Sequence, residues 1–384
     1  MTTKEKNASG GNRIYFLDNL RTVIIFLVIL YHAGGFYEAA GIYDSWWIVD
    51  DPATNNVSGI LNIILGIFVM PTLFYISGYL TPASLKNKNG WIFIKTKFTR
   101  IILPWVIGVL TVVPLYKVIF LFSRNLPQEH WSTYFHFSNG FISQSWLWYL
   151  PVLYLFNILY LLFSKLKIRI PNISMKGAVL VAFLIGFVYS VGMDILGLQG
   201  WTLTPLIDFQ KERILIYFMV FLLGALSFNQ KVFASEPKSK KLYTIVNSTS
   251  WLPITAYIFF YLFPWFSPGN YIVSEMIHKM ILWFSYLLSL LSLVYLMVET
   301  FRRYYDKPGK LWNELNQNSY YVYIIHLIVM GIIALIMRDT SIPSILKYLL
   351  LTISSYIVCN LIVSFFRSLL QPKRSESKLI GLIK

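Results

Sequence analysis

RIYFLDNLRTVIIFLVILYHAGGFY, residues 13–37, is an apolar stretch long enough to cross a bilayer as a helix, yet it contains Asp18, Arg21 and His32. An ionised side chain near the bilayer centre costs roughly 2.5–3.5 kcal/mol, so these residues predict a polar interior that uses them. At about 100° and about 1.5 Å per residue, Arg21 and His32 share one helix face about 16 Å apart. Asp18 lies one turn before Arg21, so the three residues predict a polar seam along the first helix.

The composition is typical of a membrane protein with several spans. Of the 384 residues, 56% are hydrophobic and 13% are charged, whereas a soluble protein carries about a quarter charged residues. We therefore expect an all-α, polytopic membrane protein with about ten transmembrane helices. The expected spans cover, approximately, residues 15–37, 57–82, 100–122, 145–163, 177–197, 212–228, 244–264, 273–298, 319–337 and 343–366. The seventh is the weakest, because Pro253 and Pro264 interrupt it.

Basic residues set the expected orientation. The net charge is +16, and 25 of the 33 Lys and Arg residues fall in the termini and alternate loops on one side of the expected spans. By the positive-inside rule, both termini are expected in the cytoplasm. This alternation is topological and gives no basic stripe, so we expect no nucleic-acid partner. Residues 1–372 are expected to form one membrane domain, and residues 373–384 a short basic cytoplasmic tail that contacts membrane lipid.

His32 is the strongest candidate for chemistry. A neutral imidazole can take a proton from a hydroxyl group near neutral pH, and His32 lies well towards the outer leaflet. The alternative is a histidine that is hydrogen-bonded inside the bundle for packing. Arg21 lies in the inner half, where a guanidinium suits a phosphate or carbonyl that enters from the cytoplasm. The alternative for Arg21 is a structural ion pair with Asp18, and Asp18 could also orient Arg21 for binding.

Three further residues are candidates for binding a donor. Lys97 and Arg100 begin the third span at the inner surface and could hold phosphates, although their spacing alone favours ordinary positive-inside charge. His326, about two turns into the ninth span, could add a polar group on the cytoplasmic approach to the seam. The alternative is a core histidine bonded to a tyrosine. Ser77 and Gly78 are typical of close helix packing.

Several kinds of site have no support in the sequence. No G-x-S-x-G motif surrounds Ser77, so it is not interpreted as a hydrolase nucleophile. No His, Cys, Asp and Glu spacing resembles a metal site, and no P-loop or Rossmann glycine pattern is present. We therefore expect no metal and no bound cofactor.

These motifs resemble the acyltransferase 3 family of bacterial membrane O-acyltransferases. The first span resembles the family's Leu-Asp-x-x-Arg signature followed by a histidine, with Asp18, Arg21 and His32 at those positions. Partial matches continue through FYISGYL, KFTRIILP, SWLWYLPVLY and SYYVYIIH, so that the resemblance covers essentially the whole chain. The chain looks closest to the glucan biosynthesis protein C branch. It departs from the family where Lys97-x-x-Arg100 replaces a common Arg-x-x-Arg pair, and lysine lacks the bidentate fork of arginine.

The resemblance implies an acyltransferase in a bacterial plasma membrane that moves acetyl or succinyl from cytoplasmic acyl-CoA to a hydroxyl of an extracytoplasmic glycan. Combined with the residue pattern, this reaction predicts catalytic roles for His32, Arg21 and Asp18, and donor binding by Arg21, Lys97, Arg100 and His326. The acceptor is modified by the membrane domain itself or with a separate extracytoplasmic partner. A transporter of a glycan or small organic acid would share the composition and the seam, although no internal repeat relates two halves of this chain. A structural membrane partner would leave Arg21 and His32 without a role.

Overall fold

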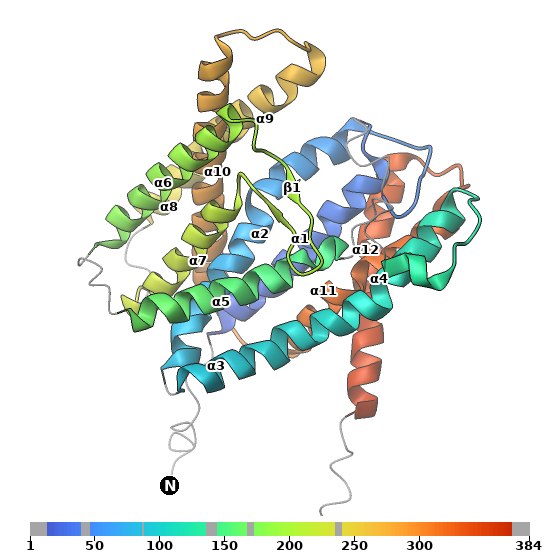
Figure 1. Cartoon of the computed structure of the whole chain (residues 1–384), viewed down its shortest axis with the longest axis horizontal. Helices are drawn as coiled ribbons and strands as arrows, with labels where there is room; N and C mark the ends of the chain where they lie inside the picture. The colour runs from blue at the N-terminus through green and yellow to red at the C-terminus, as the bar shows by residue number, and fades with distance from the viewer. Residues whose placement is uncertain are drawn as a thin grey trace, which may run out of the picture.

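The protein is a bundle of long helices with one small hairpin (Figure 1). The computed structural model describes residues 14–39, 47–86, 88–135, 144–166, 173–234 and 240–370. The helices in these ranges are α1 (Tyr15–Tyr37), α2 (Asn56–Leu85), α3 (Gly90–Lys97), η2 (Phe98–Ile102), α4 (Leu103–Ser123), η3 (Trp131–Phe135), η5 (Ser145–Trp148), α5 (Tyr149–Lys165), α6 (Met175–Ile195), α7 (Ile214–Asn229), α8 (Lys241–Thr249), α9 (Trp251–Phe266), α10 (Glu275–Tyr304), α11 (Lys310–Met337) and α12 (Ser344–Leu370).

This architecture confirms the all-α polytopic prediction. In the described residues, eight helical segments are long and apolar enough to cross a membrane. The sixth and seventh expected spans coincide with shorter helices, α7 and the pair α8 and α9. The total of ten spans and the cytoplasmic placement of both termini stay predictions.

Helix α1 lies at the centre of the bundle. It packs against α2, α10, α11 and α12, and its apolar side chains Leu20, Ile24 and Ile29 are completely buried. Apolar side chains thus surround α1 on several sides, while Arg21, Thr22 and His32 contact residues of α11. The seam predicted from the sequence therefore lies along the side of α1 that packs on α11, with Arg21 and Asp18 partly exposed.

Helices α2 and α7 cross at two glycines. A Cβ atom on Gly78 would overlap the carbonyl oxygen of Phe221, and a Cβ atom on Gly224 would overlap the carbonyl oxygen of Tyr75. Small residues allow helix backbones to approach closely in a membrane, where packing replaces the hydrophobic effect as the driving force. The packing role expected for Gly78 is confirmed.

The third expected span begins ten residues earlier than predicted. It runs from Gly90 to Ser123 and contains the π-helical turn η2. Pro104 has no N–H to donate to the carbonyl of Arg100, so that carbonyl needs another partner. The hydroxyl of Tyr320 on α11 donates to it at 3.1 Å. The proline therefore produces both the π turn and a link to α11.

The seventh expected span is divided into α8 and α9 at Ser250. The ring of Pro253 cannot donate to the carbonyl of Thr249 and would collide with it in a continuous helix. The interruption expected from the proline therefore lies at Ser250, directly after the Thr249 carbonyl that loses its partner.

A hairpin connects α6 to α7. Strands β1 (Trp201–Thr202) and β2 (Phe209–Gln210) pair antiparallel, with Trp201 opposite Gln210. The hairpin packs on η5, because the Trp148 and Trp201 rings lie 5.4 Å apart and the Gln144 amide donates to the Thr204 carbonyl at 2.8 Å. The all-α prediction did not include this element.

Candidate active site

Two histidines from α1 and α11 contact each other. The Nδ1 atom of His32 lies 2.8 Å from Nε2 of His326, and Nδ1 of His326 lies 2.7 Å from the carbonyl oxygen of Tyr323. A carbonyl oxygen only accepts, so Nδ1 of His326 must carry a proton. In the neutral ring, Nε2 of His326 is then an acceptor, and His32 donates to it from Nδ1. The lone pair of His32 is consequently on Nε2, where a general base needs it.

The depth of the two histidines explains their contact. Helix α11 begins at Lys310, earlier than the expected start at residue 319. His326 is therefore the 17th residue of α11, while His32 is the 18th residue of α1. Both lie about 25 Å along their helices, at about 1.5 Å per residue. The predicted position of His326, on the cytoplasmic approach to the seam, is wrong, because His326 lies beside His32.

Arg21 is held between its own helix and α11. A terminal nitrogen lies 3.3 Å from a carboxylate oxygen of Asp18, and Nε donates to the Ser319 hydroxyl at 3.3 Å. The Asn316 carbonyl accepts a further bond at 3.4 Å. The expected pair with Asp18 is thus present, and contacts with α11 fix the direction of the guanidinium. The pair is partly exposed, with 35% and 21% of the Arg21 and Asp18 side chains accessible.

Lys97 and Arg100 lie on the neighbouring segment of α3 and η2. The Arg100 side chain is exposed, and the Lys97 ammonium lies 5.4 Å from the centre of the Phe93 ring. The Arg100 carbonyl accepts a hydrogen bond from Tyr320 on α11. Tyr320 directly follows Ser319, the residue that contacts Arg21. The backbone at Arg100 therefore lies beside the turn of α11 that contacts Arg21, while no contact joins the side chains of Lys97 or Arg100 to Arg21 in the described residues.

A cavity of about 780 Å³ includes His32 in its wall. Helices α1, α2, α7 and α9 and the hairpin contribute to it, and aromatic rings make up much of the lining. Its polar and charged members are His32, Glu38, Asn62, Ser145, Asp208, Gln210 and Arg213. Such a lining, apolar with a few polar groups, is typical of a site for an organic ligand.

Asn62 and Asp208 are buried in this wall with polar atoms left over. The Asn62 side chain is 6% exposed, and neither its amide oxygen nor its amide nitrogen has a hydrogen-bond partner. One oxygen of Asp208 accepts from the Thr204 N–H at 2.8 Å, but the other has no partner. Burial raises the pKa of Asp208 to about 6. Unpaired buried polar atoms are unfavourable, so both residues are suited to contact a ligand.

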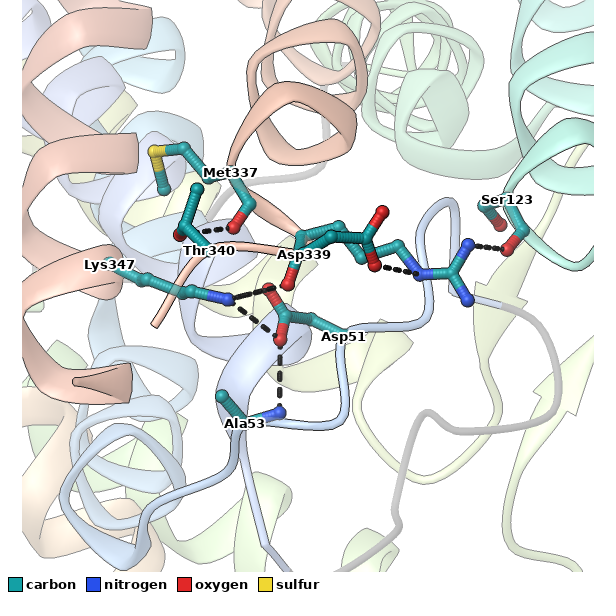
Figure 2. Close-up of polar contacts among 8 residues, drawn as sticks. Asp51, Ala53, Ser123, Met337, Asp339, Thr340 and Lys347 are labelled. Carbon is teal, nitrogen blue, oxygen red and sulfur yellow. Dashed lines mark hydrogen bonds and ion pairs between the residues drawn. The ribbon is translucent and has the colours of Figure 1, made fainter. Parts of the chain in front are cut away.

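The segment that carries Trp47 is anchored by a buried ion pair (Figure 2). The Lys347 ammonium lies 2.9 Å and 3.1 Å from the carboxylate oxygens of Asp51, and the two side chains are 1% and 0% exposed. Asp51 also accepts from the Ala53 N–H at 2.9 Å. This pair ties the segment to the start of α12, and the Trp47 ring then lies 5.7 Å from the ring of His32.

A comparison with models of protein families matches the acyltransferase domain over residues 14–364. The chain belongs to the acyltransferase 3 family. The match covers α1 through most of α12, including both histidines and the complete lining of the cavity. The protein is therefore a multi-pass membrane acyltransferase that transfers groups other than amino-acyl groups. No curated protein and no solved structure matches the chain. The glucan biosynthesis branch stays a prediction.

Several residues in the cavity of this acyltransferase were not found from the sequence. Asn62 resembles any polar residue in an apolar helix, and Asp208 and Arg213 lie in a short connection without a motif. A weak signal was nevertheless present, because Lys211 and Arg213 are basic residues on the side where positive charge is scarce. The loop that follows α4 is held to that helix, since Glu129 of the loop pairs with Lys117 of α4 at 2.6 Å.

Proposed function

We propose that this acyltransferase moves an acetyl or succinyl group from cytoplasmic acyl-CoA to a hydroxyl of an extracytoplasmic glycan, in the plasma membrane of a bacterium. The observation that supports this most is the position of His32. It lines a large, mainly apolar and aromatic cavity with a few polar groups, and its bond to His326 leaves Nε2 free of a proton.

In the proposed reaction, Nε2 of His32 removes the proton of the acceptor hydroxyl as its oxygen attacks the thioester carbonyl. The new C–O bond forms and the C–S bond breaks. The proton then passes from His32 to the departing thiolate, so that free CoA and an O-acyl glycan result. While His32 is protonated, its Nδ1–H still donates to His326, which stabilises the charge on the ring.

We assign Arg21 to the donor. Its contacts with Asp18 and Ser319 fix the guanidinium, and they use Nε and one terminal nitrogen. The second terminal nitrogen can therefore bind a phosphate or carbonyl oxygen of acyl-CoA. Lys97 and Arg100 contribute positive charge for the CoA phosphates, and Asp18 acts by orienting Arg21. We propose that His326 orients His32, rather than binding the donor.

An alternative within this class is a covalent acyl-histidine, in which Nε2 of His32 attacks the thioester first. The acceptor hydroxyl would then take the acyl group from the imidazole. Incubation with labelled acyl-CoA without acceptor, followed by denaturation, separates the two routes, because only the covalent route leaves label on the protein.

The test uses membranes that contain the wild type, His32→Ala or His130→Ala. His130 is the matched control, because it is a histidine on the exposed loop after α4, away from the cavity. Labelled acetyl-CoA and succinyl-CoA are supplied separately with an extract of envelope glycans. We expect CoA release and glycan labelling in the wild type and in His130→Ala, and a loss of about 10²- to 10⁴-fold in His32→Ala.

The outcomes separate the parts of the proposal. Release of CoA that depends on His32 without label in the glycan would retain the donor and reject the acceptor. Normal transfer by folded His32→Ala protein would reject the mechanism.

A further inference from the structure

Arg213 is a cation in the wall of the cavity that contains His32. It lies between the hairpin and the start of α7, and its side chain turns towards aromatic rings. The guanidinium carbon lies 4.8 Å from the centre of the Tyr286 ring, and a terminal nitrogen donates to the Tyr257 hydroxyl at 3.4 Å. The arginine is therefore held by cation–π and hydroxyl contacts.

No carboxylate forms an ion pair with this cation in the described part of the chain, although the charge of the adjacent Glu212 acts on it from a greater distance. None of the carboxylate oxygens there lies within 4.0 Å of its nitrogens, and the buried Nε atom has no hydrogen-bond acceptor. The adjacent Glu212 accepts instead from the Gly200 N–H at 2.9 Å. Arg213 as a whole is only partly buried, but its Nε–H has lost water without gaining an acceptor, which is unfavourable.

The other charged groups of the lining limit where an anion can bind. Asp208 and Glu38 are the acidic members of the lining. One carboxylate oxygen of Asp208 accepts hydrogen bonds from the Thr204 N–H and from the Gln144 side-chain amide. The start of α7 directly after Arg213 adds the positive end of a helix dipole. Among the described lining residues, Arg213 is the one lysine or arginine, so it is the group on which an anion would bind.

We propose that Arg213 forms a subsite for a carboxylate carried by one of the two substrates of the transfer. This inference rests on the proposed function, and it concerns which substrate that function uses. A carboxylate accepts two parallel N–H bonds from a guanidinium, so it would supply the direct ion-pair partner that no described carboxylate gives Arg213. The carboxylate could belong to a dicarboxylic acyl group on the donor or to an acidic sugar of the acceptor.

The kinetic test compares substrates that differ in the carboxylate. Succinyl-CoA and butyryl-CoA are both four-carbon donors, and only the first carries the extra charge. A glucan oligosaccharide and its uronate derivative form the acceptor pair. Each pair is measured with the wild type, Arg213→Gln, Arg213→Lys and the control Lys211→Gln, which removes a charge from the same hairpin outside the cavity lining.

We expect the wild type to prefer the charged member of one pair by about 10- to 100-fold in kcat/KM, as for hydrogen bonds between charged groups. Arg213→Gln should remove this preference, Arg213→Lys should retain part of it, and Lys211→Gln should keep it. The pair that shows the preference identifies the donor or the acceptor as the source of the carboxylate.

Turnover that depends on His32 but shows no preference for charge in either pair would overturn the inference and leave the proposed function intact. An unchanged preference in Arg213→Gln would also overturn it. If none of these donors is turned over, thermal unfolding of the purified protein decides the question. Stabilisation by succinate or glucuronate over the neutral succinamide and glucuronamide, lost in Arg213→Gln, would support the subsite. Equal shifts would reject it.

Discussion

Nδ1 of His32 and Nε2 of His326 lie 2.8 Å apart, in a chain of hydrogen bonds that ends at the main chain of α11. Because the final acceptor is a carbonyl oxygen, the tautomer of both neutral rings is fixed, with the proton of each ring on Nδ1. We propose that the second histidine orients the first. This is the function that a carboxylate performs in other histidine-dependent sites.

A first prediction follows for His326. His326→Ala removes the acceptor for His32 Nδ1–H, so the imidazole can rotate or adopt the other tautomer. We expect kcat to fall about 10- to 100-fold, less than in His32→Ala, because the base itself remains. His326→Gln can accept through its side-chain oxygen and should retain more activity than the alanine variant. Steady-state CoA release measures both, and equal losses in both would contradict the orienting role.

Asn62 permits a test that separates stability from activity. Its amide makes no hydrogen bond in the described structure, so Asn62→Leu removes no internal bond and has a similar volume. We expect unchanged or higher thermal stability together with a loss of about 10-fold in kcat/KM, if the amide contacts a substrate. A variant that loses stability and retains activity would show that Asn62 is structural.

The ion pair of Asp51 and Lys347 should matter for stability and for the position of Trp47. Asp51→Asn or Lys347→Met alone leaves one buried group without its partner, which destabilises a protein by about 3–5 kcal/mol. The double variant should recover much of this loss, because no lone charge remains. Thermal unfolding in detergent measures the effect. If the double variant were as unstable as the sum of the single variants, the pair would not be coupled.

The stability of the protein should depend on pH through Asp208. Its pKa is about 6 in the folded protein and about 4 in an unfolded chain. Between these values the folded state binds more protons, so this group makes folding less favourable as pH rises from about 4 to about 6, and the loss persists above that range.

Asp208→Asn has no such titration. We therefore expect the variant to exceed the wild type in stability at pH 8, by at most about 3 kcal/mol, and the difference to shrink towards pH 4. Unfolding temperatures measured for both proteins across this range test the prediction. The comparison between variants cancels other titrating groups. A constant difference would show that Asp208 does not titrate in this window.

The sequence by itself determined the helical membrane architecture and the family. Both are encoded locally, in apolar runs of about 20 residues and in a first span whose Asp18, Arg21 and His32 share one face because of the period of the helix. The close packing at Gly78 was also predictable, because a glycine in an apolar helix leaves room for the backbone of a neighbouring helix.

The tertiary structure alone decided which residues meet. The contact of His32 with His326 depends on where α1 and α11 begin. Helix α11 begins nine residues earlier than the sequence predicted, so His326 lies about 14 Å deeper along its helix than expected. Arg213 and Asp208 enter the cavity because a short connection folds back as a hairpin, and no periodic pattern predicts this. The local hydrophobic pattern determines which segments are helical and which residues share a helix face. Contacts between residues nearly 300 positions apart depend instead on how the helices pack.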